Sequence, residues 1–158
     1  MDVEAKKTAL RMIENGVFVL TAKSEDESFG STVTWLTQSS FKPPLITLAL
    51  RADSGIYRAV RDSKRFALHM LRTDQSSFAG DFFKPSRSSV ENINDHPYSL
   101  SGRGNPILDE APAYLECELC HRVEKGDHHV VIAEVVEAEV RDAATALKLS
   151  DTGWSYRG

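Results

Sequence analysis

The pentapeptide CELCH, residues 117–121, has the Cys-x-x-Cys-His spacing that attaches haem covalently in c-type cytochromes. Cysteines at this spacing also bind metals or form redox-active dithiols. Each of these uses requires a turn or a helix, in which residues i and i+3 converge. The segment 114–123 instead predicts a strand, in which Cα atoms three residues apart lie ~10 Å from each other. A disulfide needs this distance below ~7 Å, so we expect no haem, metal or dithiol here.

Strand alternation assigns the two cysteines to opposite faces of this strand. Cys117 then becomes a small core residue, and Cys120 points the other way. One predicted face holds Leu115, Cys117, Leu119, His121 and Val123, and the other holds Glu116, Glu118, Cys120 and Arg122.

No other short motif predicts a metal site or a nucleophile. His121, His128 and His129 are close in sequence, but zinc-type spacing is absent and adjacent histidines on a strand face opposite ways. The chain contains no GxGxxG, Walker or GxSxG pattern. We therefore predict no metal, and no conventional catalytic constellation is visible.

Two further segments allow a functional or a structural interpretation. In GSTVTWLTQSSFKPPL, residues 30–45, hydroxyl side chains surround Trp35, which fits either a ligand site or ordinary strand propensity. Residues 51–72 are rich in arginine and lysine, which fits either a solvated helix face or a phosphate site.

The elements that would carry these residues are mainly strands. We expect a helix over 3–14, a hairpin of strands 17–22 and 31–37, a buried strand over 45–50, a short helix beginning at Asp53 or Ser54, and a strand over 66–71. A second short helix fits 74–83, residues 84–112 read as one long loop, and strands over 114–123 and 129–140 flank a turn. This order favours one mainly β domain over 1–158, with short helices attached to a closed barrel.

Composition limits the classes of partner. The chain is 41 % apolar and 27 % charged, with no apolar run near the ~20 residues that cross a bilayer. The charged N-terminus lacks a signal peptide, so we expect a cytoplasmic protein with reduced cysteines. Neither half is basic enough for nucleic acid, since residues 1–80 carry 11 basic and 9 acidic side chains and residues 81–158 carry 8 and 14.

Three segments, in order, resemble the flavin reductase-like family of FMN-binding split barrels. They are GSTVTWLTQSSFKPPLITLAL, FALHMLRTDQSSFAGDFF and APAYLECELCHRVEKGDHHVVIAEVVEAEV, and the closing TGWSYRG is similar to the family's short aromatic tail. The resemblance covers roughly residues 15–158. It implies a homodimer of split barrels, each binding one FMN that NAD(P)H reduces, with electrons passing to free flavin, a ferric complex, a redox protein or a monooxygenase.

The resemblance also implies a set of site residues. Ser31, Thr32, Val33, Thr34 and Trp35 match the strand along the isoalloxazine ring; Leu50, Arg51 and Ser54 match the turn near the ribityl chain and phosphate; Lys84 and Ser86 match the region that completes the phosphate site; and His128 matches the catalytic histidine of the Gly-Asp-His turn. FMN supplies its own redox chemistry, which agrees with the missing catalytic constellation.

Two positions differ from the family pattern. Trp35 stands where many flavin reductases have a small hydroxyl residue, and Ile56 replaces a threonine often found near the phosphate. A bulky aromatic residue at position 35 is closer to the flavoredoxin type, an FMN electron carrier with little NAD(P)H activity. A non-catalytic flavin- or haem-binding module is the other alternative.

Overall fold

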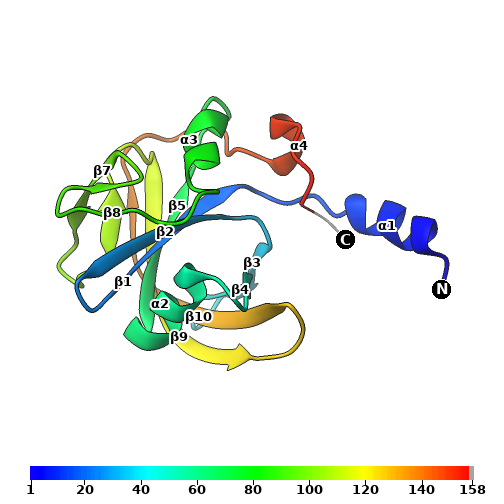
Figure 1. Ribbon diagram of the computed structural model, residues 1–158, viewed down its shortest axis with the longest axis horizontal. Coiled ribbons are helices and arrows are strands. Elements are labelled where there is room, and N and C mark those ends of the chain that lie inside the picture. The colour runs from blue at the N-terminus through cyan, green and yellow to red at the C-terminus, as the bar shows by residue number, and fades with distance from the viewer. Residues whose placement is uncertain (157–158) are drawn as a thin grey trace.

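The computed structural model describes residues 1–156, and Arg157 and Gly158 of the expected aromatic tail lie outside this described part. Its main feature is a seven-stranded antiparallel sheet in the order β2-β1-β5-β9-β10-β4-β3 (Figure 1). The strands are β1 (Phe18–Ser24), β2 (Glu27–Val33), β3 (Leu36–Ser40), β4 (Leu45–Arg51), β5 (Arg65–Met70), β9 (Ala113–Val123) and β10 (His128–Val140). The helices are α1 (Val3–Arg11), α2 (Gly55–Ser63), α3 (Ser76–Asp81) and α4 (Leu149–Thr152).

The sheet curls but does not close, because β2 and β3 at its two ends do not pair with each other. This confirms the split barrel and shows that the closed barrel expected from the number of strands is wrong. The outer edge of β2 has another partner: the Thr32 amide donates a hydrogen bond to the Phe82 carbonyl at the end of α3, with an N···O distance of 3.3 Å. An edge that bonds a helix end cannot also complete a barrel.

The predicted strand over 31–37 is wrong as a single element. β2 ends at Val33, β3 begins at Leu36, and Thr34 and Trp35 form the crossing between the two ends of the sheet. The Leu36 amide bonds the Thr34 carbonyl, and the Trp35 carbonyl accepts a hydrogen bond from the Ala49 amide of β4. The β-rich composition predicted a continuous strand, but these bonds turn the chain from one edge strand to the other.

Helix α2 forms as predicted and closes the inside of the curled sheet. Ser54 caps it by accepting a hydrogen bond from the Tyr57 amide at 3.2 Å. Its buried residues Ile56, Tyr57, Ala59 and Val60 pack in the main core with residues of β1, β4, β5, β9 and β10. This packing fixes the β4–α2 turn, where Arg51 and Ser54 lie.

The long loop expected over 84–112 is also wrong in part, because it contains a small sheet of β6 (Asn92–Ile93), β7 (His96–Leu100) and β8 (Pro106–Leu108). Asn94 and Asp95 turn the first hairpin with φ of 51° and 71°, a conformation that these two residue types tolerate. Strands this short show no sustained sequence period. Buried Glu116 of β9 anchors the sheet by bonding Ser101 and Asn105.

Strand β9 contains the CELCH pentapeptide, as predicted, but a β-bulge interrupts its alternation. Leu119 pairs with Ala133 and His121 with Ile132, so Cys120 has no partner on β10 and the predicted face assignment fails beyond Leu119. Both cysteines are free; Cys117 is fully buried and Cys120 is exposed. Burial raises the pKa of the Cys117 thiol to about 12, so it does not act as a thiolate.

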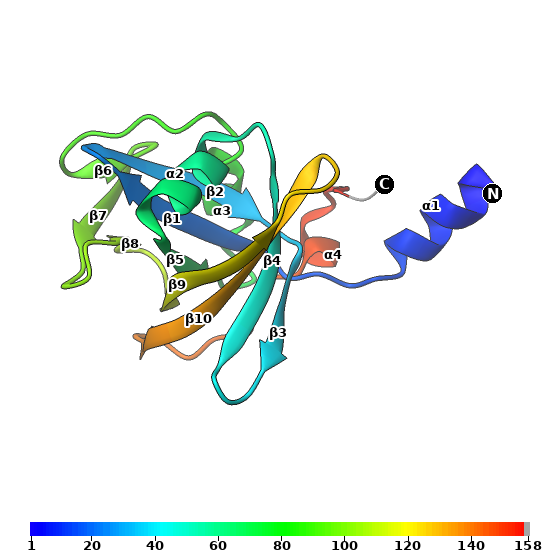
Figure 2. The same cartoon turned by 90° about the horizontal axis from the view of Figure 1, so that it is seen from below.

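Helix α1 projects away from the rest of the molecule, as both ribbon views show (Figure 2). Asp2 caps it, but none of its residues is buried. No helix within residues 1–156 combines the length and apolar character needed to span a membrane.

Candidate functional site

A cavity of about 510 Å³ lies where the β2–β3 crossing, the β4–α2 turn and the C-terminal segment meet. Pockets of this size bind cofactor-sized molecules in many proteins. The cavity brings together most of the residues that the sequence predicted, namely Ser31, Thr32, Val33, Thr34, Trp35, Leu50, Arg51, Ser54 and His128. Apolar side chains complete the lining, among them Ile56, Phe82 and Trp154.

The predicted Lys84 and Ser86 lie elsewhere. Lys84 is exposed and lines a separate hollow with Asp81 and Arg87. The Ser86 hydroxyl is within 2.9 Å of both the amide nitrogen and the carbonyl oxygen of Gly30, and it fastens the following loop to β2. Neither residue lines the cavity in this structure.

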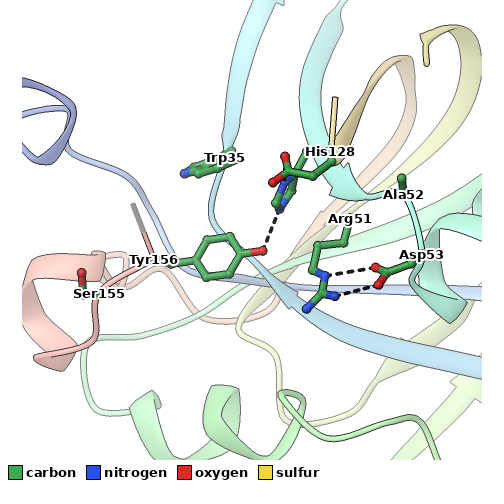
Figure 3. A pocket seen from close by; sticks show the side chains of 8 residues that line it. Trp35, Arg51, Ala52, Asp53, His128, Ser155 and Tyr156 are labelled. Carbon is green, nitrogen blue, oxygen red and sulfur yellow. Dashed lines mark hydrogen bonds and ion pairs between the residues drawn. The ribbon is translucent and has the colours of Figure 1, made fainter. Parts of the chain in front are cut away.

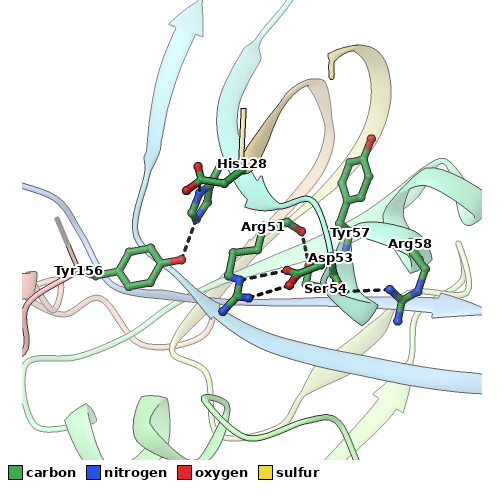
Figure 4. Close-up of polar contacts among 8 residues, drawn as sticks. Arg51, Asp53, Ser54, Tyr57, Arg58, His128 and Tyr156 are labelled. Atoms are coloured by element: carbon green, nitrogen blue, oxygen red, sulfur yellow. Dashed lines mark hydrogen bonds and ion pairs between the residues drawn. The ribbon is translucent and has the colours of Figure 1, made fainter. Parts of the chain in front are cut away.

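The β4–α2 turn presents polar groups to the cavity (Figure 4). The Ser54 hydroxyl donates to the Arg51 carbonyl at 2.7 Å. The Arg51 guanidinium donates two hydrogen bonds to the Asp53 carboxylate, at 3.1 and 2.8 Å, and this arginine holds the pKa of Asp53 below its usual range. Arg58 donates to the Asp53 carbonyl at 3.0 Å. The turn therefore carries a positive charge that is shared with one carboxylate, and a hydroxyl whose proton is already donated to the backbone.

Trp35, His128 and Tyr156 line both this cavity and a second one of about 620 Å³, whose lining is drawn in Figure 3, and these three rings form an aromatic wall between the two. The ring centroids of Trp35 and His128 are 4.6 Å apart, and those of Trp35 and Tyr156 are 5.4 Å apart. The second cavity also contacts Asp53 and Asp127. The three wall residues can therefore contact a molecule in either cavity.

His128 is hydrogen-bonded on both ring nitrogens. Its Nδ1 lies 2.9 Å from Oδ1 of Asp127, and its Nε2 lies 2.7 Å from the Tyr156 hydroxyl. The hydrogen bond from His128 lowers the pKa of Asp127, whereas partial burial raises the pKa of Tyr156. Asp127 is thus a carboxylate and Tyr156 a neutral phenol at neutral pH. The neighbouring His129 packs against Tyr57 instead, with centroids 4.8 Å apart.

The lining fits a flat aromatic group with a polar edge. Leu50, Ile56 and Phe82 are buried apolar side chains, and Phe82 can approach β2 because Gly30 has no side chain: a Cβ there would lie 2.8 Å from the ring. Within the described residues, the buried Thr34 hydroxyl oxygen has no hydrogen-bond partner. Buried polar atoms are rarely left unpaired, so this oxygen points to a ligand with a polar edge.

Phe82, Trp154, Ser155 and Tyr156 were not among the predicted site residues, although they line the cavity. The aromatic residues in the closing TGWSYRG were the available signal. Sequence reasoning used them only as part of the family resemblance and assigned no role to Tyr156.

The family model described as "Flavin reductase like domain" matches residues 10–156. The reductase component of a 4-nitrophenol 4-monooxygenase/4-nitrocatechol 2-monooxygenase from Rhodococcus opacus is 32 % identical over 144 residues, covering 91 % of this chain and 72 % of that protein. A putative diflavin flavoprotein from Nostoc sp. is 30 % identical over 151 residues. That match covers 94 % of this chain and only 26 % of the relative, so this chain spans about a quarter of the diflavin protein.

A similar solved structure is that of an NADH:FAD oxidoreductase from Streptomyces globisporus, in complex with NAD and FAD fragments. Its TM-score is 0.79 at 26 % identity, and the alignment covers 95 % of this chain and 88 % of that chain.

Proposed function

The chain belongs to the flavin reductase-like family, and on this premise we propose that it is an FMN-binding oxidoreductase in which NAD(P)H reduces the flavin. The single observation that supports this most strongly is the cavity at the β2–β3 crossing, with apolar walls and the unpaired hydroxyl of Thr34. The sequence relative from Rhodococcus opacus is a reductase component, which supports a monooxygenase as electron acceptor. The solved relative with NAD and FAD fragments supports a nicotinamide donor.

In this proposal, the crossing segment holds the flavin ring. Ser31 and Thr34 provide hydroxyl groups for its polar edge, and Val33, Leu50 and Phe82 provide apolar contact. Thr32 lines the same cavity, with its hydroxyl donated to the Ala79 carbonyl. The bound flavin would accept two electrons as hydride and pass them on, which no side chain of this chain can do. The protein's own contribution is to orient the ring and exclude water from it.

The phosphate of FMN is proposed to lie at the β4–α2 turn. Arg51 supplies a guanidinium, and the adjacent end of α2 carries the positive side of the helix dipole. The Ser54 hydroxyl would have to release the Arg51 carbonyl in order to donate its one proton to the phosphate. Arg51 would have to divide its donors between the phosphate and Asp53. Lys84 and Ser86 remain proposed phosphate residues, and the loop that carries them would have to approach the turn.

An electron carrier of the flavoredoxin type is the second candidate, and Trp35 is the observation that favours it. The indole packs against His128 and Tyr156 and occupies space at the wall between the two compartments. A nicotinamide ring that approached from the second compartment would meet this aromatic wall. Electrons could then come from a protein donor instead of NAD(P)H.

The deciding experiment is an anaerobic absorption spectrum of the purified protein, supplemented with FMN if it is colourless. We expect flavin bands that bleach when NADH or NADPH is added. Bands that persist until dithionite is added would identify a carrier. Failure to bind FMN would contradict both candidates, and a Soret band would indicate a haem-binding module.

A further inference from the structure

Asp127, His128 and Tyr156 form a hydrogen-bonded row that runs from solvent to the wall between the two cavities. Figure 3 shows the contact between His128 and Tyr156. The Asp127 side chain is 95 % exposed, whereas that of His128 is 15 % exposed. Tyr156 reaches His128 from the C-terminal segment, 28 residues along the chain. Of these three residues, only His128 is assigned a role by the family resemblance.

The chemistry of the three groups fixes the direction of each hydrogen bond. An ionised carboxylate only accepts, so Asp127 requires a proton on Nδ1 of His128. When the imidazole is neutral, Nε2 is then an acceptor, and the Tyr156 hydroxyl must donate its proton to it. The phenol oxygen keeps its lone pairs and presents an acceptor to the cavity.

Protonation of His128 reverses this arrangement. Both ring nitrogens of an imidazolium donate, so Nε2–H donates to the phenol oxygen and the Tyr156 proton becomes free to point elsewhere. Tyr156 lines both cavities, so its hydroxyl can direct this proton to a ligand. A change of charge on His128 is thus converted into a change of hydrogen-bond direction at Tyr156.

We propose that Tyr156 is a positioning residue that makes the site selective for the anionic, reduced flavin: when His128 takes up a proton, the Tyr156 hydroxyl turns from acceptor to donor toward the cavity ligand. The inference rests on the proposed function, because the ligand is the flavin of that site. The only chemical step is the transfer of one proton from solvent to Nε2 of His128. No other bond of the protein is made or broken.

The charges around His128 agree with this assignment. Asp127 precedes His128 on the same turn and bonds its Nδ1. Arg51 of β4 is the strand partner of His128 on β10. Asp53 faces Arg51 and compensates its charge through two hydrogen bonds. Tyr156 comes from the C-terminal segment, and Trp35 contributes an uncharged ring from the β2–β3 crossing. A proton on His128 therefore adds a positive charge to the aromatic wall, while the charge of the neighbouring Arg51 is already compensated by Asp53.

The test compares the dissociation constants of oxidised FMN and dithionite-reduced FMN under anaerobic conditions, between about pH 5 and about pH 8, the general range in which histidine side chains change charge. In the wild type, we expect reduced FMN to bind more tightly than oxidised FMN, with a preference that depends on pH. In Tyr156→Phe, that preference should drop about tenfold or more, as expected for one hydrogen bond to a charged group, while oxidised FMN binds nearly as before. Tyr57→Phe is the matched control, since its hydroxyl bonds Glu124 outside both cavities, and it should behave as wild type.

A measurement without flavin keeps the inference testable if Tyr156→Phe binds neither form. Nitrogen NMR of the histidine rings at alkaline pH should show His128 protonated at Nδ1, with an Nε2 signal that moves in Tyr156→Phe and stays in Tyr57→Phe. In Asp127→Ala, the ring should lose its fixed tautomer.

Two results would overturn the inference: an Nε2–H tautomer in the wild type, or an unchanged preference for reduced FMN in Tyr156→Phe. A wild-type protein that binds neither form of FMN would instead overturn the proposed function. The two failures are therefore distinguishable.

Discussion

Arg51 is the residue on which the proposed phosphate site depends most directly. Arg51 lines both cavities, and its guanidinium donates two hydrogen bonds to the Asp53 carboxylate. We expect Arg51→Ala to weaken FMN binding by ~1 to 3 kcal/mol, about fivefold to 150-fold, because a charged hydrogen bond to phosphate is lost. Equilibrium ultrafiltration with FMN measures this change.

Lys84→Ala is the matched comparison for this prediction, since Lys84 is a cation in a neighbouring hollow outside the cavity. A loss equal to that of Arg51→Ala would extend the phosphate site to Lys84. Unchanged FMN affinity in both variants would remove the phosphate from the β4–α2 turn.

His69 makes the stability of the fold depend on pH. It is fully buried, its Nδ1 donates to the Val19 carbonyl at 2.9 Å, and its Nε2 accepts from the Leu108 amide at 3.0 Å. Burial lowers its pKa to about 4, below the ~6.5 of an unfolded chain. Between these two pKa values the unfolded state therefore binds more protons than the folded state. Buried neutral His69 thus contributes about 3 kcal/mol to the free energy of unfolding above about pH 6.5, and this contribution is lost as the pH falls toward about 4.

Urea unfolding at a series of pH values measures this dependence. The slope of stability against pH in this range should become smaller in His69→Gln and stay unchanged in His121→Gln, whose side chain is exposed on β9. A slope that is the same in both variants would show that His69 does not carry the effect.

At the residue scale, the resemblance to the family predicted most of the residues that line the cavity at the β2–β3 crossing. The segment 31–35, the β4–α2 turn and His128 converge on one cavity, because each lies within a run that could be matched to the family. Tyr156 and Phe82 were missed because their contacts connect distant segments: Tyr156 meets His128 over 28 residues, and the Phe82 carbonyl binds Thr32 over the whole of α2 and β5. No local pattern encodes such contacts.

The β2–β3 crossing is the element that most affects the choice between reductase and carrier. Trp35 interrupts the two edge strands and fills the wall beside His128. Trp35→Thr should open this wall, so we expect faster bleaching of bound FMN by NADH or NADPH and little change in FMN affinity. Anaerobic stopped-flow absorbance measures the rate of bleaching.

Trp154→Leu is the comparison variant, because it changes the other indole that lines the cavity without touching the wall of Trp35, His128 and Tyr156. A rate that stays unchanged in Trp35→Thr would mean that the indole does not obstruct the nicotinamide. It would also weaken the case for the carrier.

Helices and strands long enough to show a regular spacing of apolar residues could be predicted from the sequence, and shorter ones could not. Helix α2 and the strands β9 and β10 appear where the spacing of apolar residues and the capping Ser54 placed them. The β-bulge at Cys120 escaped prediction, because it arises from pairing with β10 and not from the sequence of β9 itself. The small sheet within 84–112 escaped for a different reason, since its strands of two, five and three residues are too short to show a pattern.

The arrangement of the whole molecule leads to a prediction about assembly. Helix α1 stands away from the body with no buried residue, and its neighbourhood carries exposed Val3, Leu10, Met12 and Ile13. Apolar side chains gathered on one projecting segment usually become covered by a partner. We expect a homodimer, as the family resemblance implies, and light scattering after size-exclusion chromatography should give twice the mass of 17.5 kDa.

A variant that replaces Leu10 and Ile13 by serine should shift this equilibrium toward the monomer if α1 contributes to the interface. Replacing the exposed Val90 by serine is the matched control, because Val90 lies on the distant 84–112 segment. A monomeric wild-type protein would contradict the predicted dimer.

The fold class could be predicted, but its closure could not. Strand number and order indicated a barrel, and the resemblance indicated a split one, which the unpaired ends β2 and β3 confirm. Whether a curled sheet closes depends on which group its edge strands meet. Here the end of α3 meets β2 through Thr32, a contact that neither strand's composition reveals.

The position of the two indoles also makes the protein its own optical probe. Trp35 and Trp154 are the only tryptophans of the chain, and both line the cavity of the proposed flavin site. All of the protein's tryptophan fluorescence therefore arises beside the ligand, with no distant indole to add a constant background. Because flavins absorb where tryptophan emits, occupancy of the site should quench nearly the whole signal, and the unmodified chain can report its own saturation.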